Sequence, residues 1–118
     1  MPRDPEKYLY DMKDAAAFLL GFVEGRSLDD LRSDRAFRSA VERELMIIGE
    51  ALFQLDKTVP EQALRISEHR RIIHFRHILV HAYDQVDAAI IWAVLTEKLP
   101  IISRELDGLL PDRPPGAQ

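Results

Sequence analysis

Apolar residues recur at helical spacing along four stretches of the chain, whereas the alternation of apolar and polar residues that marks strands is nowhere sustained. The first stretch predicts a helix over residues 5 to 24, with Asp4 as its N-cap and Pro5 at the first helical position. Asp34 caps a second predicted helix, whose apolar stripe ends near Asp56. Both helices are amphipathic, so each needs a partner that covers its apolar face.

Two more long helices are predicted in the second half of the chain. Short helical turns or loops are expected in SLDDLRSD and after Pro60. Ser67 is expected to open the third long helix, which runs through IIHFRHILVHA. The last helix begins near Asp84 or Asp87 and continues through AAIIWAVLTEKLPIISRELDGLL. Because proline lacks an N–H and crowds the preceding turn, Pro100 predicts a kink or a break in that helix.

The order of these elements predicts an all-α fold, an antiparallel bundle of four to five helices. A chain of 118 residues is too short for two independent cores, so residues 1–110 are expected to form a single domain. Residues 111–118 are rich in proline and predict a flexible tail. The last helix carries a surplus of Ile, Leu, Val and Trp, which indicates a surface for a further partner.

Composition narrows the possible functions. The net charge of −4 argues against a protein that coats nucleic acid, but basic residues cluster in EHRRIIHFRH and predict a local anion site. The chain has no cysteine, which excludes disulfides and thiolate chemistry and favours a reducing, cytoplasmic setting. No apolar run is long enough to cross a bilayer and the N-terminal segment lacks an apolar signal core, so no membrane association is expected.

The segment RHILVHAYDQVD, residues 76–87, places polar side chains on an apolar helix. At 100° per residue, Arg76 and Tyr83 fall in the same arc as the apolar residues, where an arginine must be paired or must line a cleft. Arg76 and His81 are about 140° apart on the helical repeat, too far to reach one atom easily. We therefore expect either that the helix loosens before His81 or that the two residues line a groove shared with a second copy.

Three histidines fall together on the opposite side of that helix. His74, His77 and His81 have the spacing of possible metal ligands. No cysteine and no obvious inward carboxylate completes a ligand set, so the sequence favours a run of surface histidines over a metal site.

Arg76 and Tyr83 can also be explained by purely structural roles. Arg76 could serve only as the ion-pair partner of Glu44 or Glu50 in the second helix. Tyr83 could be an aromatic residue at a helix end that packs beside Trp92. Taken singly, none of these residues identifies a function.

Taken together, these residues form an Arg-x4-His-x-Tyr pattern made of Arg76, His81 and Tyr83. The pattern resembles that of the HepT-like branch of HEPN domains. Members of this branch are toxin ribonucleases encoded beside a minimal nucleotidyltransferase antitoxin. RELMIIGEAL, at residues 43–52, resembles the second-helix signature of that family, and FRHILVHAYDQVDAAIIWAVLTEKLPII resembles its third and fourth helices. This branch usually has Asn after the motif Arg, whereas this chain has His77; the wider superfamily accepts Asn, Asp or His there.

The resemblance implies a homodimer in which the motifs of two protomers face one cleft and cut RNA without a metal or a cofactor. The chemistry suits these residues, because an imidazole can transfer a proton near neutral pH and a guanidinium can hold the charge that builds on a phosphate. His81 is then the general acid or base, Arg76 the phosphate clamp and His77 a supporting polar residue or a second proton-transfer group.

The resemblance also implies a role for Tyr83. Its phenol would be the site to which the partner nucleotidyltransferase attaches AMP from ATP, which silences the toxin. An adenylate there would block RNA by charge and by volume. The alternative is a catalytically inactive dimer that binds a nucleotide or the nucleotidyltransferase through Arg76 and His81.

Overall fold

A computed structural model describes residues 4–110, and within that range the chain is almost entirely helical and contains no strand. The α-helices are α1 (Pro5–Phe22), α2 (Leu28–Ser33), α3 (Arg35–Thr58), α4 (Pro60–Ala63), α5 (His69–Ala82), α6 (Ala88–Ala93) and α7 (Leu99–Leu109). A 3-10 turn, Tyr83–Gln85, precedes α6, and a π-helical turn, Val94–Lys98, joins α6 to α7. The predicted all-α bundle is confirmed. The predicted tail lies outside the described residues.

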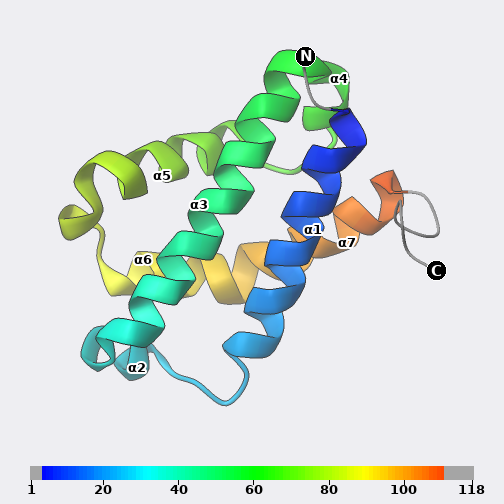
Figure 1. Cartoon of the computed structure of the whole chain (residues 1–118). Helices are drawn as coiled ribbons and strands as arrows, with labels where there is room; N and C mark the ends of the chain where they lie inside the picture. Colours follow the sequence, from blue (N-terminus) through cyan, green and yellow to red (C-terminus); the bar gives the residue numbers. More distant parts are fainter. Residues whose placement is uncertain (1–3, 111–118) are drawn as a thin grey trace.

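The long helix α3 is the centre of the bundle. It packs against α1 on one side and against α5 on the other, and α1 also packs against α7. Figure 1 shows α1 and α3 running side by side in opposite directions, with α5 and the stretch from α6 to α7 crossing them. In the described part of the chain, every helix is too short or too polar to cross a lipid bilayer. Completely buried side chains come from all the long helices and include Met12, Leu19, Val41, Leu52, Leu55, Leu79, Ile91 and Leu106.

The predicted starts of the first two long helices are confirmed by their capping contacts. The Asp4 carboxylate accepts a hydrogen bond from the Glu6 N–H at 3.0 Å, and Pro5 follows in the first turn. The Asp34 carboxylate accepts from the Phe37 N–H at 3.0 Å. Each bond satisfies a backbone donor that has no partner within its own helix. The end of α3 lies slightly beyond the predicted one near Asp56.

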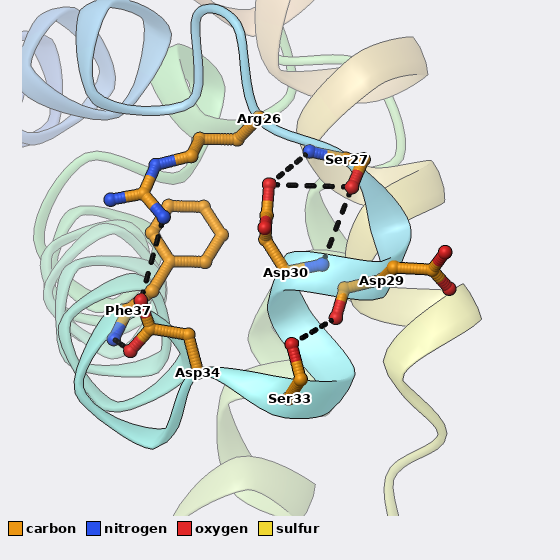
Figure 2. Close-up of polar contacts among 7 residues, drawn as sticks. All are labelled: Arg26, Ser27, Asp29, Asp30, Ser33, Asp34 and Phe37. Carbon is orange, nitrogen blue, oxygen red and sulfur yellow. Dashed lines mark hydrogen bonds and ion pairs between the residues drawn. The ribbon is translucent and has the colours of Figure 1, made fainter.

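The segment between α1 and α3 is organised by local polar contacts, which Figure 2 shows. Ser27 and Asp30 form a capping box: the Asp30 N–H donates to the Ser27 hydroxyl at 3.3 Å and the Ser27 N–H donates to the Asp30 carboxylate at 2.8 Å. The Arg26 guanidinium lies 4.5 Å from the centre of the Phe37 ring and 3.5 Å from the Asp34 carboxylate. The Phe37 N–H, and after it Arg26, lower the pKa of the Asp34 carboxyl.

The prediction that Ser67 opens the third long helix is wrong. That helix, α5, begins at His69, after Glu68 in the left-handed conformation with φ 57° and ψ 34°. The Ser67 N–H donates to the carboxylate of Glu105 in α7 at 2.9 Å, and the Ser67 hydroxyl contacts the same carboxylate. A partner 38 residues along the chain therefore takes the groups that would have capped α5.

The predicted features of the last helix are confirmed. The Asp87 carboxylate caps α6 by accepting from the Ala89 N–H at 2.8 Å. The α-helical pattern then breaks at the π-helical turn Val94–Lys98, and Pro100 stands in the first turn of α7. Pro100 has no N–H to donate to the Thr96 carbonyl, and its ring would collide with that carbonyl in a regular α-helix. A wider π-helical turn before the proline relieves both problems.

Candidate functional site

The candidate site is built around the crossing of α3 and α5, which depends on Gly49. A Cβ atom at Gly49 would lie 2.2 Å from the Cβ and 2.8 Å from the Cγ of Arg76, distances that non-bonded atoms do not reach. The two backbones can therefore approach this closely only because residue 49 has no side chain. Gly49 is a positioning residue for Arg76 that the sequence interpretation missed, although it lies inside the quoted Ile-Gly-Glu-Ala stretch.

The Arg76 guanidinium contacts Glu50, the residue next to Gly49. Arg76 Nη2 lies 2.6 Å from Glu50 Oε1, and Gln54 Nε2 donates to Glu50 Oε2 at 2.9 Å. Of the two partners considered from the sequence, Glu50 is the one found. The Arg76–Glu50 contact is close but too poorly aligned for a hydrogen bond, and within residues 4–110 both Glu50 Oε1 and the buried Arg76 Nε lack a hydrogen-bond partner. The guanidinium of Arg76 is thus held by an ion pair with Glu50, while its Nε is buried beneath it.

Arg76 lines a hollow of about 600 Å³ between α1, α3 and α5. Arg43 brings a second guanidinium to this hollow, while Asp11 and Glu50 bring carboxylates. Arg43 was not singled out from the sequence, since only the packing of α3 against α1 and α5 gives it a place beside Arg76. The mixed charges mean that an anion entering the hollow competes with Glu50 for Arg76.

Three of the four histidines of α5, His74, His77 and His81, lie on its exposed surface, whereas His69 at its first position is buried. The rings of His77 and His81 are in contact, with centroids 4.5 Å apart. His77 and His74 also line a hollow of about 410 Å³ with Asp56 and neighbouring residues of α3 and α5. In the described range, no group of three or more His, Asp or Glu side chains is placed to hold one metal ion.

Arg76 and His81 do not line the same hollow within one chain. Arg76 faces α3, whereas His81 is exposed and in contact with His77. The helix α5 stays α-helical through Ala82, so it does not loosen before His81 as one of the two sequence alternatives required. The separation calculated from the helical repeat therefore persists in the folded chain.

Tyr83 is the first residue of the 3-10 turn after α5, and its side chain is 61% exposed. Burial against the core therefore does not explain the residue. Arg38 of α3 fixes the segment that follows, because its Nη2 donates to the Val86 carbonyl at 2.6 Å and its Nε donates to Glu42 at 2.8 Å. The structure presents the Tyr83 phenol to solvent on a short, anchored connection.

An apolar hollow of about 470 Å³ lies between α5, α6 and α7. Two of its lining residues, Ile90 and Ile101, are 53% and 40% exposed, which is high for isoleucine. At its edge, Lys98 lies 2.7 Å from the Glu68 carboxylate, and Lys98, followed by Arg71, lowers the pKa of Glu68. The surplus of apolar residues predicted for the last helix is thus found as a surface bordered by charges.

Comparison with known proteins shows which family has this architecture. A family model described as Ribonuclease HepT-like matches residues 12–109 of the chain, nearly the whole described bundle. The chain belongs to the HepT-like ribonuclease family. The matched range includes the whole of α5 and the 3-10 turn that follows it. The predictions of a HepT-like HEPN fold and of an endoribonuclease are confirmed at the level of the family.

Curated relatives of this HepT-like chain carry consistent names. A candidate RNase of Methanocaldococcus jannaschii is 28% identical over 89% of this chain and 95% of its own length. A protein of Thermococcus cleftensis named "Probable ribonuclease HepT" is 30% identical over 92% of this chain and 98% of its own length. A candidate RNase of Caldanaerobacter subterraneus is 30% identical over 92% of this chain and 96% of its own length. No solved structure matches the chain significantly.

Proposed function

We propose that this HepT-like ribonuclease is the toxin of a toxin–antitoxin pair and cuts RNA internally, without a metal, at a site shared by two protomers. The observation that carries the proposal is the division of α5 into two functional faces. One face holds Arg76 at the hollow between α1, α3 and α5, and the other presents His77 and His81 to solvent. Family membership supplies the RNA substrate class.

The proposed reaction uses the RNA's own 2′-hydroxyl as the nucleophile. His81 takes the proton from that hydroxyl, or gives a proton to the leaving 5′-oxygen, while the oxygen attacks the adjacent phosphorus in line. Arg76 holds the negative charge that builds on the non-bridging oxygens. His77 supports the phosphate or transfers the second proton. The products are a 2′,3′-cyclic phosphate and a free 5′-hydroxyl, so every proton removed is returned.

The separation of Arg76 and His81 supports a dimeric site. Because Arg76 and His81 leave α5 about 140° apart, Arg76 of one protomer is proposed to serve His81 of the other. The apolar hollow bordered by Ile90 and Ile101 is a suitable contact surface for a second copy, since exposed isoleucines gain stability when a partner covers them.

Tyr83 is proposed as the acceptor of AMP from a minimal nucleotidyltransferase antitoxin. Its exposure and its position two residues after His81 support this role, because an adenylate there brings negative charge and bulk beside the histidines.

A Tyr83→Phe protein should cut RNA but escape silencing by the partner enzyme and ATP. Intact mass should show an added AMP on the wild type only; silencing of the Phe variant by modification would contradict the role.

The function is tested by incubating purified protein with total cellular RNA in EDTA and identifying the product ends. The wild type and a His74→Ala control should cut and leave 2′,3′-cyclic phosphates, whereas His81→Ala should be at least 100-fold slower. Cutting that stops in EDTA would contradict metal independence. Absence of cutting by wild type whose intact mass shows no AMP would favour the alternative, a silent binding module.

A further inference from the structure

We propose that His77 and His81 together bind a divalent transition-metal cation such as Zn²⁺ or Ni²⁺, and that the bound cation inhibits the enzyme. The binding half stands on the geometry of α5 alone, and the inhibition half rests on the proposed function.

The geometry of the two rings fits a shared ion. His77 and His81 are four residues apart on one continuous α-helix, so their side chains leave the same face one turn apart. With Zn–N bonds of about 2.1 Å, two imidazoles on one tetrahedral ion have ring centroids about 5 Å apart. The rings here are 4.5 Å apart. Both side chains are exposed, so a small rotation can turn one nitrogen of each toward a common ion.

The donor atoms determine which cation the pair prefers. Imidazole nitrogen suits Zn²⁺, Ni²⁺ and Cu²⁺, whereas Mg²⁺ and Ca²⁺ require oxygen ligands. In the described range no third His, Asp or Glu joins the pair in one group, so water completes the coordination shell. Two protein ligands should give binding weaker than that of a structural zinc site, and an ion that exchanges with solvent.

Occupancy of this site would remove the group that the proposed reaction needs most. A metal bound to His81 takes the nitrogen lone pair with which the imidazole accepts a proton, so His81 can no longer act as a base. It also fixes the His77 ring against His81. Arg76 lies on another side of α5 and would stay available for RNA, so the cation should lower the rate of cleavage more than the affinity for RNA.

The site is tested by titrating ZnCl2 or NiCl2 into chelator-free full-length protein, with calorimetry for affinity and NMR for the histidine ring protons. The chain has four histidines, which makes assignment practical. We expect one ion per chain, changes at His77 and His81, and no binding of MgCl2. His77→Asn should weaken binding at least about ten-fold, and His74→Ala, the matched control on the same surface, should not. Equal binding by the wild type and His77→Asn would overturn the site.

Inhibition is tested by measuring RNA cleavage against the concentration of ZnCl2, each variant relative to its own metal-free rate. For the wild type and His74→Ala, the ZnCl2 concentration that halves the cleavage rate should be close to the Kd from calorimetry, and EDTA should restore the rate. For His77→Asn, that concentration should be at least about ten-fold higher. Equal sensitivity of His77→Asn would overturn inhibition through this pair. Metal-free wild type that cuts no RNA would overturn the proposed function and the inhibition with it, while the titration still decides the metal site.

Discussion

At the scale of single residues, Gly49 shows how one missing side chain positions another. Glycine in the middle of a helix costs up to about 1 kcal/mol relative to alanine. Here the close approach of α3 to α5 outweighs that cost, because no larger residue leaves room for Arg76. The same approach places Arg76 next to Glu50, which holds its guanidinium at the edge of the hollow.

We expect Gly49→Ala to destabilise the protein by about 1–3 kcal/mol, since the added methyl group overlaps the Arg76 side chain and must push α5 away from α3. RNA cleavage should fall as well, because Arg76 moves with α5. Urea unfolding followed by circular dichroism measures the first effect.

Gly21→Ala is the matched control. Gly21 lies in α1, and an added Cβ meets nothing within 4 Å there. That variant should be as stable as the wild type or slightly more stable. Equal stabilities for the Gly49 and Gly21 variants would contradict the close crossing of α3 and α5.

At the scale of elements, side-chain caps determine where the helices begin. Asp4, Asp34 and Asp87 each accept a hydrogen bond from a backbone N–H of the first helical turn. In the described range α4, α5 and α7 begin without a side-chain cap, and α5 follows the left-handed residue Glu68. The start of α5 is held instead by two contacts, that of Ser67 with Glu105 in α7 and that of Glu68 with Lys98 in the π-helical turn.

The Asp34 cap should make stability depend on pH. Because the folded state lowers the pKa of this carboxyl, its contribution is present above the ordinary pKa and is lost as the pH falls through the lower, folded value. Asn is as good a helix cap as Asp but does not titrate. When the pH falls below about 4, the Tm of Asp34→Asn should therefore fall less than the Tm of the wild type. Asp34→Ala should have a lower Tm already at pH 7. Equal decreases of Tm with falling pH for the wild type and Asp34→Asn would contradict the predicted role of Asp34.

At the scale of the whole molecule, the single chain presents two surfaces that bear on the proposed dimer. One is the proposed catalytic site, where Arg76 and His81 lie on different sides of α5. The other is the apolar hollow between α5, α6 and α7. The proposed association of two chains would involve both, which leads to two predictions.

Complementation between inactive variants tests the shared site. If Arg76 of one protomer serves His81 of the other, a mixed dimer of Arg76→Ala and His81→Ala contains one intact site. Co-expression of the two variants in equal amounts should then restore about a quarter of wild-type activity, since half of the dimers are mixed and each has one of two sites. No recovery in purified mixed dimers would show that each protomer supplies its own pair.

The apolar hollow is tested through its exposed isoleucines. A double variant, Ile90→Asp with Ile101→Asp, should be monomeric by light scattering and inactive on RNA, because carboxylates in a dimer contact would be buried without partners. Leu64→Asp is the matched control, since Leu64 is 65% exposed and does not line this hollow. A double variant that stays dimeric would place the contact elsewhere.

The sequence by itself determined the elements and the family. Periodicity, the caps Asp4 and Asp34, and Pro100 predicted the helices, with the start of the last one left between Asp84 and Asp87, because helix formation and capping depend on residues within a few positions of one another. The sequence also determined the spacing of Arg76, His81 and Tyr83, since residues close together in the chain keep a fixed order and, along one helix, a fixed angular separation.

Only the tertiary structure decided what lies between elements. It assigned Glu50 rather than Glu44 to Arg76, placed Arg43 beside them and made Gly49 the point of closest approach. It also turned Ser67 away from α5 toward Glu105. The physical reason is the same in each case: these contacts depend on how helices cross, and a crossing is fixed by packing between residues far apart in the chain.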